Sequence, residues 1–219
     1  MAWTTPGTAT AGNVLTAAFW NANVRDNSLM GSPVYTNEAA RDAAITAPSE
    51  GMSVYLTAPT IPAATGSITA VPTGIQTIYN GSVWVCITEI GARSETNGTT
   101  LSTSFVPTLT GDTTPISVTL VTGTTASVNL GFTGFTAGTT MYASVAVSGA
   151  TTMASSIARA AFKQDLSNAV ANITSHQASF ILTGLTSGSN TFTLEYKVIA
   201  AATGNFNSGA RNLIVKGVA

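Results

Sequence analysis

The chain has 219 residues and a mass of 22.2 kDa, with eight lysine and arginine residues against nine aspartate and glutamate residues. A balance so close to neutral offers no basic face for phosphates, so it argues against nucleic acid and anionic membranes as partners. The single cysteine, Cys86, excludes an internal disulfide framework, and the single histidine, His176, excludes a histidine-based metal cluster. We expect no cofactor.

The chain is poor in charged residues and rich in threonine and serine. Only 8% of the residues are charged, whereas 44% are hydrophobic, and residues 113–158 contain no acidic or basic side chain. Ordinary soluble domains carry about a quarter charged residues. The composition therefore predicts a shape held by sheet hydrogen bonds, with part of its surface covered by partner subunits.

No segment has the pattern of an export signal or a membrane span. The first basic residue is Arg25, so no charged region precedes an apolar one, and no apolar stretch approaches the ~18 residues that a spanning helix needs. We therefore expect a soluble product of the cytoplasm without membrane insertion.

The first part, residues 1–32, is predicted to start as an extended tail and to continue as a helix. Residues 17–30 contain neither glycine nor proline, Thr16 can cap them, and their apolar residues recur at helical spacing. An isolated helix of this length is marginal in water, so Phe19 and Trp20 should be buried. They pack either in the core of the same chain or against a sister subunit or larger particle.

The second part, residues 33–90, is predicted to contain a short helix capped by Asn37 and a three-stranded sheet. The strands are the runs rich in β-branched and aromatic residues at 52–56, 74–79 and 82–87. Asn80-Gly81 joins the last two and predicts a two-residue type I′ turn. Residues 58–73, uncharged and rich in proline, are predicted as a loop. A sheet this small needs a covering partner.

The third part, residues 91–219, contains about eight short strand-like runs separated by glycine, asparagine, serine or proline. Alternation is clearest in residues 191–198, where every second residue is apolar. The predicted core face there consists of Phe192, Leu194, Tyr196 and Val198. This pattern predicts an antiparallel β-sandwich of jelly-roll type.

Motifs for catalysis are missing from the sequence. It has no G-x-S-x-G, P-loop, G-x-G-x-x-G after a strand, or H-E-x-x-H. We interpret His176, at the start of a predicted strand, as structural. Cys86 falls on the Trp84 face of its strand, which predicts a small, buried and inert thiol. We therefore expect a protein that is not an enzyme.

The N-terminal segment has the form W-x-x-P…G-x-V-L-T-A-A-x-x-N-x-x-V-R-D-N, which resembles the opening of many structural proteins of tailed bacteriophages. The second part, EAARDAAITAPSEGMSVYL…IQTIYNGSVWV, is similar to a small helix-and-hairpin module of phage fibre and head proteins. The third part, with SFILTGLTSGSNTFTLEYKV and RNLIVKGV, is similar to the tumour-necrosis-factor-like jelly rolls at phage fibre tips, which usually form trimers. The matching N-terminal residues are Trp3, Pro6, Gly12, 14–18, Asn21, Val24, Arg25, Asp26 and Asn27.

The resemblance implies a virion structural protein, assembled in the host cytoplasm. Residues 1–32 would attach to capsid or tail components, residues 33–90 would form a neck, and residues 91–219 would project as a homotrimeric jelly roll. No solenoid period or sustained heptad appears, which favours a short head fibre or decoration over a long adhesin. The candidate anchor and interface residues are Trp3, Phe19, Trp20, Val24, Arg25 and Asp26.

An alternative function stays open beside the first one. The chain would then be a receptor-binding protein of the tail tip that recognises a host surface glycan. Exposed aromatic side chains near polar groups would mark such a site. The candidates for this distal contact, because they lie in glycine-rich segments, are Phe132, Phe135 and Phe206.

Overall fold

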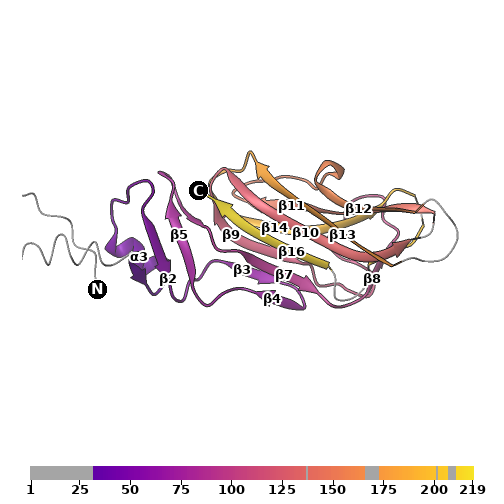
Figure 1. The fold of residues 1–219 in the computed structure, drawn as a ribbon, viewed down its shortest axis with the longest axis horizontal. Coiled ribbons are helices and arrows are strands. Elements are labelled where there is room, and N and C mark those ends of the chain that lie inside the picture. Colours follow the sequence, from indigo (N-terminus) through magenta and orange to yellow (C-terminus); the bar gives the residue numbers. More distant parts are fainter. Residues whose placement is uncertain (1–31, 137, 166–172, 201, 207–210) are drawn as a thin grey trace, which may run out of the picture.

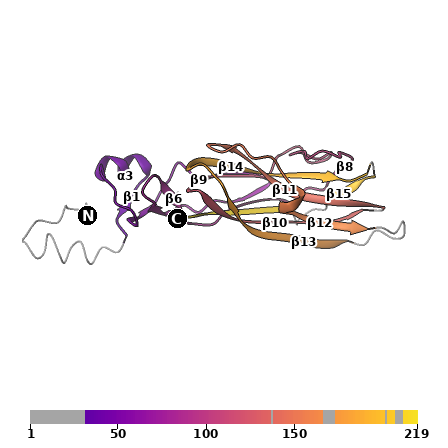
Figure 2. The same cartoon turned by 90° about the horizontal axis from the view of Figure 1, so that it is seen from above.

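The computed structural model describes residues 32–136, 138–165, 173–200, 202–206 and 211–219. The described chain is mainly β, with a small module at one end of an elongated molecule and a larger β-sandwich beyond it (Figures 1 and 2). The helix predicted for residues 17–30 and all the candidate anchor residues, from Trp3 to Asp26, lie outside the described residues. Among the residues described, no helix has the length and apolar character to span a membrane.

The small module combines one short helix with a sheet. Helix α3 (Glu38–Ala44) begins after Asn37, whose Oδ1 accepts the backbone N–H of Ala40 at 3.0 Å, so the predicted cap is confirmed. The sheet has the order β1-β2-β5-β6 and thus four strands rather than the predicted three. The extra strand, β1 (Val34–Tyr35), runs parallel to β2 (Ser53–Leu56). A two-residue strand is too short to show as a pattern in the sequence.

The predicted hairpin forms between β5 (Ile75–Tyr79) and β6 (Trp84–Cys86), but its turn differs from the predicted one. The Asn80 backbone N–H donates to the Val83 carbonyl at 3.1 Å, which centres the turn on Gly81 and Ser82. The Asn80 side chain accepts from the N–H groups of Ser82 and Val83. Gly81 has a φ of 87°, which glycine adopts readily. Asn80 therefore stabilises the turn from outside its centre.

The segment predicted as a loop, residues 58–73, contains two strands that join the sandwich. Strand β3 (Ala63–Thr65) pairs with β9 (Ser117–Thr122), and β4 (Ile68–Ala70) pairs with β7 (Ile90–Ser94). Between them, a Cβ on Gly66 would lie 2.7 Å from the Arg93 carbonyl oxygen, so the backbones approach too closely for a larger residue. The prediction failed because both strands gain their hydrogen-bond partners from remote parts of the chain.

The sandwich consists of two antiparallel sheets, consistent with a jelly-roll sandwich. One has the order β12-β11-β14-β9-β3; the other has the order β4-β7-β16-β10-β15-β8, with β13 also paired to β10. The remaining bounds are β8 (Gly98–Thr100), β10 (Thr125–Thr136), β11 (Thr139–Gly149), the 3₁₀ helix η2 (Ile157–Arg159), β12 (Ala160–Asp165), β13 (Thr174–Thr183), β14 (Gly188–Val198), β15 (Gly204–Phe206) and β16 (Arg211–Val218).

Most of the predicted strands form, with one clear exception. Residues 103–109 make only two isolated bridges, Val106 with Tyr196 and Leu109 with Asp112, instead of a strand. Pro107 follows Val106 directly and has no backbone N–H to donate to a ladder. The sequence also did not predict the short strands β8 and β15.

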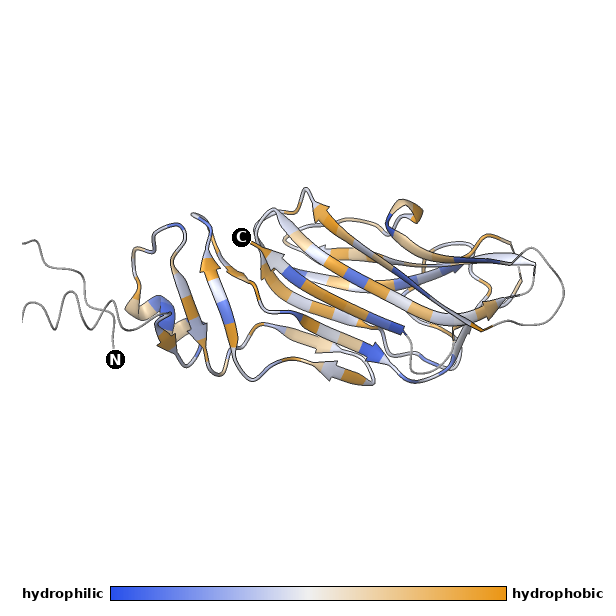
Figure 3. Cartoon of the chain, in the orientation of Figure 1, coloured by the Kyte–Doolittle hydropathy of each residue, from blue (hydrophilic) through white to orange (hydrophobic). Residues whose placement is uncertain are grey.

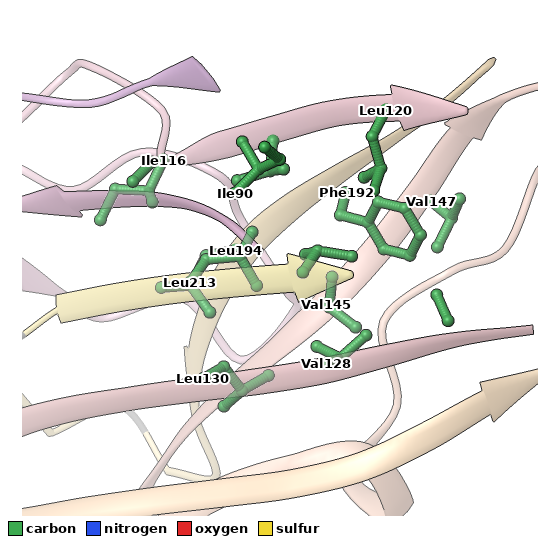
Figure 4. Close-up of a cluster of buried hydrophobic side chains, with 14 of the residues drawn as sticks. Ile90, Ile116, Leu120, Val128, Leu130, Val145, Val147, Phe192, Leu194 and Leu213 are labelled. Atoms are coloured by element: carbon green, nitrogen blue, oxygen red, sulfur yellow. The ribbon is translucent and has the colours of Figure 1, made fainter. Parts of the chain in front are cut away.

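The core lies between the two sheets and follows the predicted alternation. Phe192, Leu194, Tyr196 and Val198 of β14 are all buried, whereas the residues between them face outward. Hydrophobic and polar residues alternate along the long strands in Figure 3. In Figure 4, side chains from both sheets, including Leu120, Val128 and Leu213, meet in one cluster. The predicted burial of Cys86 is also confirmed, and burial raises the pKa of its thiol to about 11.

A buried ion pair ties the last strand to the loop before β9. Arg211 bonds to Asp112, and it also donates to the Ser94 hydroxyl at 2.9 Å and the Thr96 carbonyl at 2.6 Å. Burial opposes the ionised form of Asp112, but hydrogen bonds from Ser94 and Arg211, together with the Arg211 charge, outweigh it. They hold the pKa of Asp112 below its ordinary value.

Candidate interaction surface

The free edges of the two sheets lie next to each other on one side of the sandwich. Among the described residues, β12 pairs only with β11, and β13 pairs only with β10. Figures 1 and 2 both show β12 and β13 side by side. We call this side, formed by residues 157–165 and 173–183, the β12–β13 edge. Each of these strands therefore has one edge that pairs with no other strand of the described residues.

Strand β13 lacks the features that normally protect an edge strand. It is ten residues long, and its sequence, TSHQASFILT, contains no proline, lysine, arginine, aspartate or glutamate. Its inward-facing residues His176, Ala178 and Phe180 are only partly buried, in contrast to their counterparts on the central strands. A long, uncharged and incompletely covered edge strand favours pairing with another chain.

Large exposed hydrophobic side chains also belong to the residues that form this edge. More than half of the surface of each of these side chains is exposed. Soluble monomers usually expose only small contiguous apolar patches. The residues are Ile157, Phe162, Ile173 and Ile181. Together with the two strand edges, they make the β12–β13 edge a candidate interaction surface.

A row of aromatic side chains with one lysine continues from this edge across the outer face of the neighbouring sheet. Tyr142 of β11 lies opposite both Phe162 of β12 and Lys197 of β14. The Tyr142 and Phe162 ring centroids are 6.0 Å apart. The Lys197 ammonium lies 5.7 Å from the Tyr142 centroid and 4.9 Å from that of Phe105, within the range of cation–π attraction.

The polar groups at the β12–β13 edge form a short hydrogen-bonded chain between the two strands. The Lys163 ammonium donates to the Thr174 hydroxyl at 2.9 Å, and that hydroxyl lies 2.7 Å from His176 Nε2. Burial and the Lys163 charge both lower the pKa of His176. The imidazole is therefore neutral near pH 7, and the edge strand carries no charge of its own.

Two of the three residues predicted for a distal contact are buried in the core. Phe132 is 1% exposed and Phe206 is 0% exposed. Their ring centroids lie 5.1 Å apart, and Phe206 also packs on Tyr196 at 4.8 Å. Their glycine-rich segments are strand positions that face the core, rather than loops. Phe135 is half-buried on the opposite face of β10.

Two aromatic residues of this surface were not predicted from the sequence: Phe162, which is exposed, and Tyr142, which is half-buried. Alternation in AAFKQD places Phe162 on the face opposite Ala161 and Lys163, and the structure buries these two neighbours instead. Strict period-two counting would thus have revealed Phe162 as an outward-facing residue. Across the described ranges, no three His, Cys, Asp or Glu side chains lie together as a metal site.

Comparisons with known proteins find similarity in structure alone. No protein family matches the sequence, and no curated protein matches it either. A structural neighbour is the tumour-necrosis-factor-like protein Eiger TNF from S. frugiperda, with a TM-score of 0.40 and 9% identity over 57% of this chain and 87% of that chain. Another is a CBM22-1–GH10 xylanase of Clostridium thermocellum complexed with xylohexaose. Its TM-score is 0.31 and its identity is 13%, over 56% of this chain and 26% of that chain. These values do not assign the chain to either family.

Proposed function

We propose that this chain is a non-enzymatic virion structural protein of a tailed bacteriophage, a short trimeric fibre or decoration attached through its N-terminal residues. The observation that carries the proposal is the β12–β13 edge. A charge-poor sandwich with a long uncharged edge strand needs a partner, and a second and third copy supply one by symmetry.

The arrangement of the molecule supports attachment at one end. The described chain starts in the small module, at the end farthest from the sandwich loops, and the long strands of the sandwich run away from that module (Figure 1). Attachment through the residues before Ser32 would therefore leave the sandwich projecting. The small module would then occupy the neck of a short fibre.

Burial of apolar surface is the driving force for the proposed trimer. Each copy exposes Phe162 and three isoleucines at the β12–β13 edge. Apolar area removed from water contributes about 25 cal/mol per Å². Because β13 carries no charged residue, its contact with another copy meets little cost from desolvating ions. In a closed three-fold arrangement, the β12–β13 edge of every copy is buried against a neighbouring copy. No edge then stays open for growth into a filament.

The first prediction concerns the oligomeric state. The native mass at micromolar concentration should be three times the 22.2 kDa of one chain. Phe162→Glu places a carboxylate in the contact and should give monomers with unchanged circular dichroism, because the side chain is exposed within one copy. Light scattering after size-exclusion chromatography measures both masses.

Leu101→Glu provides the matched control for this experiment. Leu101 is as exposed as Phe162 but lies outside the β12–β13 edge, so this variant should stay trimeric. A monomeric native protein, or a trimer of Phe162→Glu, would contradict the proposal. In a monomer the aromatic row from Phe162 to Phe105 would be free, and recognition of a host surface glycan would become the favoured function.

The second prediction concerns attachment to the particle. Removal of residues 1–31 keeps Ser32, whose hydroxyl bonds to the Ser53 hydroxyl at 2.8 Å, and should leave a folded trimer. We expect this shortened protein to be missing from purified particles, whereas the full chain is incorporated. Mass spectrometry of particles from complemented infections measures the difference. Equal incorporation of both proteins would refute the role given to the N-terminal residues.

A further inference from the structure

A crevice of about 310 Å³ lies where the small module meets the sandwich. Residues of α3, β5 and β6 form one wall, and Val121 of β9 with Ser189 of β14 forms the other. The lining is mostly apolar, with Ile75, Val83 and the Trp84 indole among its members. It is distinct from the β12–β13 edge and shares no residue with it.

Arg41 brings a buried positive charge to this crevice. Its side chain is only 7% exposed, and the guanidinium carbon lies 4.8 Å from the centroid of the Trp84 ring. Its Nε donates to the Asp42 carboxylate at 2.8 Å. Among the described residues, neither Nη nitrogen of Arg41 has a hydrogen-bond partner. Arg41 lines the crevice, so its Nη nitrogens can meet a molecule bound there.

The two carboxylates closest to Arg41 in sequence are already engaged. The Glu38 carboxylate accepts the N–H of Thr60 at 2.9 Å, the Thr60 hydroxyl at 2.9 Å and the N–H of Ile61 at 3.0 Å. Burial opposes its ionisation, but these donors lower its pKa and keep it charged. Asp42 is 57% exposed to water and bonds to Nε. Neither carboxylate satisfies the Nη edge of Arg41.

We propose that the crevice binds a carboxylate attached to a small apolar body. A guanidinium presents paired N–H donors that match the two oxygens of a carboxylate, and the Trp84 ring holds its plane in place. The apolar walls accept the carbon atoms next to the carboxylate. This chemistry suits a free small carboxylic acid or an acidic side chain flanked by apolar residues in a partner protein. The inference does not depend on the proposed trimer.

The third prediction tests this site in the full chain with two pairs of probes. Phenylacetate is compared with phenylacetamide, and the peptide acetyl-Leu-Glu-Leu-amide with acetyl-Leu-Gln-Leu-amide. We expect each acid to bind at least tenfold more tightly than its amide, measured by calorimetry and by the shift of indole N–H signals. Arg41→Met keeps the apolar stem but loses the donors, and should remove the preference for the acid.

Two further variants keep the test independent of folding. Ser189→Phe fills the crevice from the exposed sandwich wall and should abolish binding of both acids without touching Arg41. Arg93→Met, at an exposed ion pair outside the crevice, should change the affinity less than twofold. A stronger response to phenylacetate assigns the site to small acids, and a stronger response to the peptide assigns it to a partner protein. Equal binding of acids and amides, or full binding by Arg41→Met, would overturn the proposal.

Discussion

Asp112→Ala is expected to destabilise the sandwich by about 3–5 kcal/mol. The substitution leaves the Arg211 guanidinium buried without its counter-ion, because the side chain is 1% exposed. It also removes the acceptor of the Ser94 hydroxyl. Urea unfolding followed by circular dichroism measures the loss.

Two comparison variants separate the buried charge from a general effect of the substitution. Glu95→Ala breaks the Arg93–Glu95 pair, whose side chains are about half exposed, and should cost less than ~1 kcal/mol. Replacing both members of the buried pair, Asp112→Leu with Arg211→Met, leaves no unpaired charge and should be less harmful than Asp112→Ala alone. A double variant that is less stable than the single one would contradict this account.

The same ion pair predicts a dependence of stability on pH. The folded-state pKa of Asp112 lies below its value in the unfolded chain, which is about 3.9. The contribution of the pair is therefore complete above that unfolded value and is lost as the pH falls through the folded-state pKa. Between about pH 5 and about pH 2, the native protein should lose more stability than Asp112→Ala does.

Phe206→Ala should cost about 3–5 kcal/mol, because it removes a fully buried ring from the core. The Phe206 ring contacts the rings of Phe132 and Tyr196, so the cavity is lined by rigid neighbours that cannot easily collapse. Thermal and chemical unfolding at neutral pH measure the change. A cost this large excludes a primary role for Phe206 in an exposed contact.

Phe135→Ala provides the matched control for Phe206→Ala. Phe135 pairs with Asn205, the residue before Phe206, but its ring lies on the other face of the same sheet and is half-buried. Its loss should cost only about 1–2 kcal/mol, in proportion to the smaller area removed from water. Similar costs for Phe135→Ala and Phe206→Ala would show that the two rings share one environment, contrary to the structure.

The β12–β13 edge and the crevice give the molecule two surfaces of different chemistry. The edge is extended and includes the uncharged strand β13, which suits repeated contact between identical copies. The crevice is small and presents one buried cation, which suits recognition of a single group. If both proposals hold, self-association and ligand binding use separate sets of residues of one chain. The effect of Phe162→Glu on the oligomeric state and the effect of Arg41→Met on ligand binding can therefore be measured independently.

Local patterns in the sequence determined much of this fold. Period-two alternation placed Phe192, Leu194, Tyr196 and Val198 in the core, because side chains of a strand point alternately to its two faces. The Asn37 cap was predictable because it involves a residue only three positions along the chain. The mainly β character followed in the same way from short β-branched runs with turn residues between them.

Only the tertiary structure decided which strands become neighbours and which edges stay open. The pairing of β3 and β4 with the sandwich depends on hydrogen bonds to remote strands, and the Asp112–Arg211 pair joins residues 99 positions apart. The burial of Phe206, the exposure of Phe162 and the position of Arg41 over Trp84 likewise depend on what the folded chain packs against each of them. Alternation assigns a side chain to a face of its strand, but long-range packing determines whether that face meets the core, a partner or water.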